Sequence, residues 1–290
     1  MSLGILTNVA ATYAENNLNS TQNSLNTVLQ QLSSGSRINS GADDAAGLSV
    51  SDGLTANEAA LTQSAQNAQN GVGLLQTADG ALSQVTNLLD RATTLATEAA
   101  NGGLTAAQST AADTEFQSII TEIGNIGTST NFNSTNVFSA TPTNFVVSDG
   151  TVGGTTTIAA TVGALTSASV GVTATDVAGV ITTAAGEDLS TQNLTSQASA
   201  KTALTAVTTA ISDVSAQRGS IGADTNQLNA AANVASSEEV NLSSAQSSIL
   251  STNYGQATSD LAKYQVLSQT GISALAQANS TQQEILKLLQ

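Results

Sequence analysis

Apolar residues recur at steps of three and four along most of this chain, the spacing that places side chains on one face of an α-helix. The longest run predicts one helix from about residue 43 to residue 100, stopped by Gly102 and Gly103. A second run predicts a shorter helix that ends before Gly127, and a third run lies in the C-terminal half. Such a run forms an apolar stripe, or seam, along one face of its helix, and seams of this kind favour a bundle packed as coiled coils. The side chains expected in its core are Leu75, Leu82, Val85, Leu89, Phe116, Ile119, Ile123, Leu204, Val207, Ile211, Val214 and Leu228.

The two chain ends have the same helical spacing with weaker seams and almost no charge. Residues 1–36 contain one charged side chain, Glu15, and residues 264–290 contain two, Glu284 and Lys287. Chain ends are normally solvated and carry charge freely, so we expect both ends to be buried together or against further copies of the chain. Chance is the alternative, because only 9% of the chain is charged. The packing residues expected at the ends are Leu3, Leu6, Tyr13, Leu18, Leu25, Val28, Leu32, Leu261, Ile272, Leu275, Ile285, Leu286 and Leu289.

Between the helical runs the composition changes to Thr, Val and Gly over about residues 137–185. Short β-prone runs there are separated by Asp149-Gly150 and Gly153-Gly154, dipeptides that are typical of hairpin turns. This pattern predicts a small antiparallel β insertion, which we expect at the distal end of the helical rod.

These patterns together predict a mainly α fold. Long coiled-coil helices from both chain ends are expected to form a rod-like bundle, with the β insertion in the middle of the chain. The expected segments are an N-terminal end helix and linker over 1–42, long bundle helices over 43–136 and 186–235, the β-rich insertion over 137–185, and a C-terminal end helix over 236–290.

Two acidic pairs are interpreted as helix starts. Asp43-Asp44 follows Ser40, and Glu238-Glu239 follows Ser236-Ser237. The oxygens of Ser40 or Asp43 can accept from the free N–H groups of a following helix, and acids there complement its positive end. Asp43-Asp44 could also bind a cation, but it lacks the further spaced oxygen ligands of a calcium loop.

The composition argues against most chemistry and most partners. The chain has no Cys and no His, which removes thiol nucleophiles, thiolate metal sites and imidazole bases, so we expect no enzyme activity, no metal and no cofactor. Its net charge is −15, and its six basic residues are scattered. Nucleic acids and anionic membrane surfaces need a clustered positive patch, and neither is therefore an expected partner.

The first residues, MSLGILTNVAATYAENN, have no basic region and no sustained apolar stretch. We therefore expect neither a cleavable signal nor a membrane span. The lack of Cys fits a protein that works in any redox compartment, including outside the cell.

Residues 32–92, LSSGSRINSGADDAAGLSVSDGLTANEAALTQSAQNAQNGVGLLQTADGALSQVTNLLDRA, resemble bacterial flagellin in order and spacing. Residues 1–138 follow the N-terminal region of that family through Phe132-Asn133. Residues 201–290 are similar to its C-terminal region and end in SQTGISALAQANSTQQEILKLLQ. The resemblance leaves out the middle of the chain, where flagellins vary.

The resemblance implies a structural subunit that polymerises into the flagellar filament, the helical propeller of swimming bacteria. In the family the end helices pair as an inner tube, the long adjoining helices form an outer tube, and the variable region lies outside. The implied partners are other copies of the chain, an export chaperone, the filament cap and the hook-associated proteins. The implied route is unfolded export, without signal cleavage, through the flagellar type III apparatus to an extracellular filament.

The resemblance also bears on individual positions. Arg91, Leu95 and Glu115 match positions by which some flagellins engage an innate immune receptor, although Thr94 replaces the usual acid. Residues 241–255 lack the charged residues usual in the family, which puts its ion pairs between subunits in doubt here.

Two other functions remain open from the sequence. A hook-filament junction protein would resemble flagellin at both ends and is the nearest alternative. A carbohydrate-active or proteolytic enzyme carried in the insertion would have to rely on Asp149 and Asp176, which are nearly the only acids there.

Overall fold

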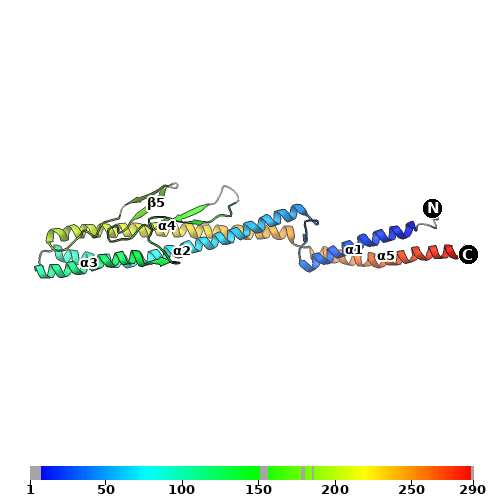
Figure 1. Cartoon of the computed structure of the whole chain (residues 1–290), viewed down its shortest axis with the longest axis horizontal. Coiled ribbons are helices and arrows are strands. Elements are labelled where there is room, and N and C mark those ends of the chain that lie inside the picture. Colours follow the sequence, from blue (N-terminus) through cyan, green and yellow to red (C-terminus); the bar gives the residue numbers. More distant parts are fainter. Residues whose placement is uncertain (1–7, 151–155, 178–179, 185, 289–290) are drawn as a thin grey trace. The chain divides into compact units, whose positions relative to one another are not determined.

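The computed structural model describes residues 8–150, 156–177, 180–184 and 186–288 (Figure 1). This part of the chain is mainly helical, with short strands between the third and fourth helices, which confirms the expected fold class. The helices are α1 (Val9–Ser34), α2 (Ala45–Ala100), α3 (Ala106–Ser129), α4 (Gln197–Leu250) and α5 (Tyr254–Leu288). The strands are β1 (Asn131–Phe132), β2 (Thr135–Asn136), β3 (Thr143–Val146), β4 (Thr157–Ala160), β5 (Thr173–Val177) and β6 (Val180–Ala184).

The chain divides into two compact units. The terminal unit comprises residues 1–56 and 241–290, and the central unit comprises residues 57–240. The terminal unit is therefore built from both ends of the chain, which lie far apart in sequence.

In the terminal unit, α1 and α5 pack against each other as an antiparallel pair (Figure 1). Asn8 Nδ2, beside the start of α1, donates to the carbonyl of Ala278 near the end of α5 at 3.0 Å. Further along, Leu18 packs over Gly271, where an added Cβ would lie 3.2 Å from Leu18 Cδ1. The small residue in α5 thus lets the larger side chain of α1 into the seam.

The link between α1 and α2 and the link between α4 and α5 are tied together by backbone hydrogen bonds. α1 ends at Gly35, whose left-handed φ of 73° suits glycine. The N–H of Arg37 donates to the carbonyl of Leu250 at 2.6 Å, and the N–H of Thr252 donates to the carbonyl of Gly35 at 3.1 Å. Each link therefore supplies hydrogen-bond partners for backbone groups that the end of a helix leaves free in the other link.

Asp44, and not Ser40 or Asp43, accepts from the first turn of α2. Its Oδ1 accepts from the N–H of Gly47 at 2.9 Å. Asp43 Oδ2 instead accepts from the N–H groups of Asn39 and Ser40 in the preceding loop, at 3.0 and 2.8 Å. The expected helix start is confirmed, but the capping residue differs by one position.

The helix start expected at Glu238-Glu239 is wrong. Both residues lie inside α4, which continues without interruption to Leu250. The break falls at residues 251–253, where the other link is available to pair with the freed backbone groups. Two adjacent serines and two acids are compatible with a helix interior when no other group competes for the backbone N–H and C=O groups of the helix.

In the central unit, α2, α3 and α4 share one apolar core. Of the twelve side chains expected in the bundle core, ten are buried, and Leu204 and Ile211 are half-buried against the same cluster. Alanines such as Ala78, Ala96 and Ala210 fill many remaining positions. The small side chains allow the helix backbones to approach closely, which compensates for the small number of large apolar residues.

The described residues between α3 and α4 form three separate two-stranded antiparallel ladders. β1 and β2 are joined by Asn133 and Ser134, both with positive φ (48° and 63°), as a tight hairpin requires. β3 pairs with β4, from Thr143 opposite Ala160 to Val146 opposite Thr157, and β5 pairs with β6. The expected antiparallel insertion is confirmed, although it is not a single sheet.

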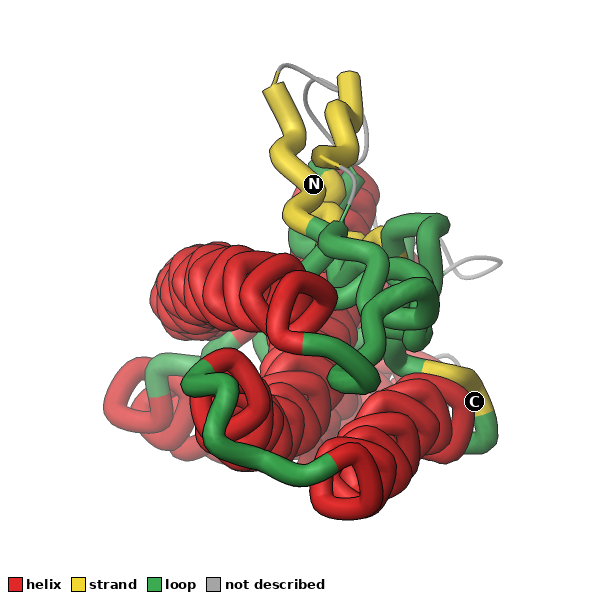
Figure 2. Tube along the Cα trace, turned by 90° about the vertical axis from the view of Figure 1, so that its left-hand side faces the viewer, coloured by secondary structure: helices red, strands yellow, loops and turns green. Residues whose placement is uncertain are grey.

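The insertion lies along the helices of the central unit and not at their end, contrary to expectation (Figure 1). Its strands and loops stand to one side of the helices (Figure 2). The carbonyl of Ser148 accepts at 2.8 Å from Oγ of Ser64, which lies in the first half of α2, well inside the helix. Farther on, Gly171 approaches α4 so closely that an added Cβ would lie 2.5 Å from Asp213 Cβ.

Gly127 does not end α3, which continues to Ser129. A Cβ at Gly127 would collide with the carbonyl oxygen of Leu165. The glycine therefore serves the docking of the insertion on α3 and not the termination of the helix.

Candidate assembly surface

The terminal unit buries very few of its own apolar side chains. Among its described residues only Val28, Ile38 and Ala257 are buried apolar side chains. Large apolar side chains that stay exposed, by 43% to 68%, are Val9, Tyr13, Leu29, Val50, Tyr254, Val266, Leu267 and Ile272. Monomeric proteins rarely leave this much apolar surface uncovered unless it meets a partner.

The contact between α1 and α5 buries its apolar side chains only in part. Leu18, Leu25 and Leu32 recur every seven residues and are only half-buried, while Val28 between them is buried. On α5, Leu261 and Leu275 are half-buried as well. Two helices can cover only one stripe of each other, so the remaining faces of both stay open to water.

The expected end-packing residues fall into three groups in the structure. The first group is covered at least in part. Val28 is buried, and the half-buried members are Leu18, Leu25, Leu32, Leu261 and Leu275. Tyr13 and Ile272 are exposed, by 68% and 56%. Leu3, Leu6 and Leu289 lie outside the described residues, as do the side chains of Ile285 and Leu286.

Sequence reasoning missed Leu29, Val266 and Leu267, which are exposed on the same helix pair. They fall outside the stripe that defines the seam. A search for a second apolar stripe on each helix would have found them.

Few charges would have to be desolvated if this surface were covered. α1 carries Glu15 as its one charged residue, and α5 carries Asp260, Lys263, Glu284 and Lys287. Burial of an unpaired charge is costly, whereas full burial of one Leu, Ile or Val side chain stabilises by about 1.5–3 kcal/mol. Association costs on the order of 4–15 kcal/mol, so burial of several such side chains per copy is enough to offset it.

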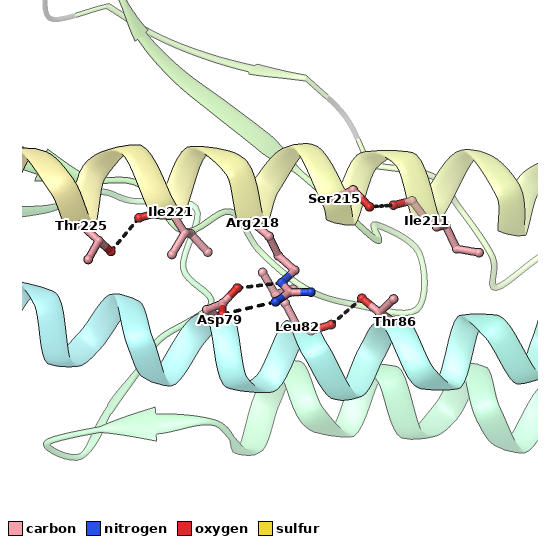
Figure 3. Close-up of polar contacts among 8 residues, drawn as sticks. All are labelled: Asp79, Leu82, Thr86, Ile211, Ser215, Arg218, Ile221 and Thr225. Carbon is pink, nitrogen blue, oxygen red and sulfur yellow. Dashed lines mark hydrogen bonds and ion pairs between the residues drawn. The ribbon is translucent and has the colours of Figure 1, made fainter.

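In the central unit, an ion pair joins α2 to α4. Arg218 Nε lies 2.7 Å from Asp79 Oδ1, and Arg218 Nη2 lies 3.4 Å from Asp79 Oδ2. Figure 3 shows this side chain reaching across from α4, while the hydroxyls of Thr86, Ser215 and Thr225 bond to carbonyls of their own helices. The hydrogen bond to Asp79 raises the pKa of Arg218. Both side chains are more than one third exposed, so the pair contributes little to stability.

The positions expected to face the immune receptor are not all at the surface. Arg91 Nε and Glu115 Oε1 form an exposed ion pair at 2.7 Å between α2 and α3. Its hydrogen bond lowers the pKa of Glu115. Leu95 is only 4% exposed and belongs to the helical core. Arg91 and Glu115 are therefore the two of these side chains that a partner could reach.

The described residues contain no cluster of three or more acidic side chains that could hold a metal ion. Within the same residues, no helix is both long enough and apolar enough to cross a membrane.

Long helices, a β insertion between them and chain ends with uncovered apolar faces define a structural protein that associates with copies of itself. Two models of protein-family regions match this chain: the bacterial flagellin N-terminal helical region over residues 5–143, and the bacterial flagellin C-terminal helical region over residues 204–289. The chain belongs to the bacterial flagellin family. It is a structural subunit of the bacterial flagellar filament.

Individual relatives are similar in sequence to this chain over nearly its whole length. The chain is 30% identical to a flagellar filament 30.7 kDa core protein of Treponema maltophilum, with 97% of this chain and 98% of the relative covered. A flagellin of Halalkalibacterium halodurans is 31% identical, and flagellin FlaB2 of Treponema pallidum is 33% identical, with the same coverage. None of these comparisons favours a hook-filament junction protein.

Proposed function

We propose that the filament is held together mainly by the faces of α1 and α5 that the α1/α5 pair leaves uncovered. The observation that carries this proposal is the contrast between the two units: nearly all buried apolar side chains belong to the central unit, whereas most exposed ones belong to the terminal unit. Neighbouring copies supply the missing cover. Tyr13, Val266 and Ile272 are the side chains whose burial changes most on assembly.

The segments then have different places in the filament. Residues 1–42 and 236–290 form the inner layer, residues 43–136 and 186–235 form the outer layer, and residues 137–185 project outside. This division is supported by the nearly uncharged end helices, which suit a protein-lined interior, and by the Thr-rich insertion, in which Thr141, Thr143, Thr156 and Thr157 are exposed to solvent.

The assembly route involves other flagellar proteins. The chain is exported unfolded through the flagellar type III apparatus, is held before export by a chaperone, and is added beneath a filament cap at the end of a filament that hook-associated proteins join to the hook. The weak seam between α1 and α5 supports this route, because it permits the chain ends to remain unfolded until they are incorporated. The chain has no enzyme activity and does not bind nucleic acid, as its lack of His and Cys and its net charge of −15 suggest.

The surface is tested with the double variant Val266→Asn and Ile272→Asn. Both side chains are exposed, so the monomer should keep its helical circular dichroism, while filament formation followed by light scattering and electron microscopy should be lost or strongly reduced. The matched control is Val146→Asn, an exposed valine of the insertion, which should polymerise normally. Polymerisation of the double variant at the wild-type critical concentration would refute the proposal.

A coarser test uses deletions of residues 1–30 or of residues 264–290. Each truncated chain should remain a soluble monomer that cannot elongate filaments. Normal polymerisation of both would show that the chain ends are not the assembly elements.

A further inference from the structure

The chain contains two Asn-Gly pairs, and the structure gives them opposite environments. Asn70-Gly71 lies inside α2, where backbone N–H groups are committed to the helical hydrogen-bond ladder. Gly71 is also buried: an added Cβ would lie 2.8 Å from Leu228 Cδ1 and 3.0 Å from Phe145 Cδ2. The helix and the surrounding core therefore restrict the backbone conformation of this pair.

Asn101-Gly102 lies in the turn that follows the last residue of α2. Asn101, Gly102 and Gly103 are all exposed. The N–H of Asn101 donates to the carbonyl of Glu98 at 3.3 Å, which is longer than the usual 2.7–3.2 Å. Gly102 has a left-handed φ of 69°, and no heavy atom lies within 4 Å of the place where a Cβ of Gly103 would be. At Gly102, an added Cβ would lie 2.7 Å from Nε2 of Gln197, so the turn is covered on that side by a flexible side chain. The backbone of this turn is otherwise weakly constrained.

We propose that Asn101 is a site of spontaneous deamidation and isomerisation, and that Asn70 is protected from the same reaction by α2. The backbone nitrogen of Gly102 attacks Cγ of Asn101, the new N–Cγ bond closes a five-membered succinimide, and the Cγ–Nδ2 bond breaks. The proton lost by the Gly102 nitrogen leaves with Nδ2 as ammonia. Water then opens the ring on either side, which gives aspartate or isoaspartate; nothing is oxidised or reduced.

The environment of Asn101 favours each step. Ring closure requires ψ of the asparagine to leave the helical region, which is free to happen in an exposed turn but requires local unfolding inside α2. Glycine as the following residue places no side chain in the path of the attack and permits the backbone rotation. Water has direct access to the exposed ring.

The products alter the end of α2. Both carry a new carboxylate at the negative end of the helix, three residues from Glu98, where it is repelled by the helix dipole and by a like charge. Isoaspartate also lengthens the backbone by one atom, beside the contact in which Gln197 Nε2 donates to the carbonyl of Ala100 at 3.0 Å. Modification should therefore loosen the connection between α2 and α3 as the protein ages.

The test is timed incubation of the folded full-length protein in warm, mildly alkaline buffer, followed by cleavage after Glu. This cleavage separates the peptide 99–115, which contains Asn101, from the peptide 59–98, which contains Asn70. Mass spectrometry of the fragments locates each amide converted to an acid, and chromatography separates the two acid products. We expect Asn101 to convert at least roughly tenfold faster than Asn70 in the folded chain.

Two controls complete the experiment. In denaturant, where α2 is lost, Asn70 and Asn101 should convert at similar rates. The variant Asn101→Gln, whose longer side chain cannot form the five-membered ring, should leave the peptide 99–115 unchanged without altering the rate at Asn70. Equal rates at the two pairs in the folded chain would overturn the proposal, as would an intact Asn101 over a period in which the unfolded chain reacts at both.

Discussion

Individual residues in α4 decide how well the central unit packs. Gln217 is 2% exposed, and its Nε2 and Oε1 have no hydrogen-bond partner within the described residues. The residues before and after it on the same stripe, Val214 and Ile221, are buried and apolar. A buried amide without partners loses its bonds to water and gains nothing in return, so Gln217 lowers the stability of the core.

Replacement of Gln217 by Leu should therefore stabilise the protein. We expect an increase of about 1–3 kcal/mol in the free energy of unfolding, the usual penalty for an unsatisfied buried polar group. Urea unfolding of dilute monomer, followed by circular dichroism, measures it. Gln76→Leu is the control, because Gln76 is exposed on α2 and its replacement should change the free energy by no more than about 0.5 kcal/mol. A destabilised Gln217→Leu would indicate that the amide has a partner in solution.

A second residue-scale prediction concerns Asp213, where the insertion approaches α4. Burial raises the pKa of Asp213. The folded state therefore disfavours the carboxylate, so the stability associated with this group is fully present at low pH and is lost as the pH rises through the raised pKa. Asp213→Asn should be more stable than the wild type near neutral pH, and the difference should disappear in acid. Thermal unfolding of both proteins across this range tests it; a difference that grows in acid would contradict the assignment.

At the scale of elements, glycines determine where the insertion docks on the helices. Gly127 in α3 leaves room for the carbonyl of Leu165, and Gly171 lies against Asp213 on α4. The insertion buries apolar side chains such as Phe138, Ile158 and Leu165 in the core of the central unit, and at these glycines its backbone also comes close to the helices. Hydrogen bonds also attach the insertion to the helices: Ser64 Oγ, for example, donates to the carbonyl of Ser148 at 2.8 Å.

This docking predicts opposite effects for the same substitution at two helical glycines. Alanine normally stabilises a helix interior by about 0.5–1 kcal/mol relative to glycine. Gly80→Ala should show this gain, because no heavy atom lies within 4 Å of the added Cβ. Gly127→Ala should destabilise the protein, because the Cβ collides with the carbonyl of Leu165. Denaturant unfolding of the two variants measures both effects, and a stabilised Gly127→Ala would show that the insertion does not pack on α3 as described.

At the scale of the whole molecule, the charge distribution and the apolar surface act against each other. The formal net charge is −15, and most acidic residues belong to the central unit. The terminal unit has only six acidic residues against three basic ones, and it has many exposed apolar side chains. Association through the terminal unit therefore brings negatively charged central units together, at a cost that salt reduces.

Filament assembly should accordingly depend on ionic strength. Charges are screened over about 10 Å at 0.1 M salt and over about 30 Å at 0.01 M, so repulsion between subunits falls steeply in this interval. We expect filaments to lengthen and to resist dissociation better as salt rises from very low values. Light scattering across a salt series provides the measurement, with a neutral osmolyte as control. A flat series would mean that repulsion between subunits does not limit assembly.

The sequence by itself determined the helices and the composition of the core, because the spacing of apolar residues is a local property that each helix carries with it. It therefore predicted α2 nearly to the residue and identified the part of the chain that forms the β insertion, although not where the insertion packs. It also indicated that the nearly uncharged ends belong together, and α1 and α5 do pair.

The tertiary structure alone decided features that depend on distant segments. α4 passes Glu238 and breaks after Leu250, because Gly35 and Arg37 supply backbone partners there. The polar residue Gln217 occupies the buried stripe of α4 between Val214 and Ile221, because the other helices of the central unit cover that face. Gly127 continues a helix that its residue type would be expected to end. In each case the local pattern permits two outcomes, and contacts from elsewhere in the chain select one.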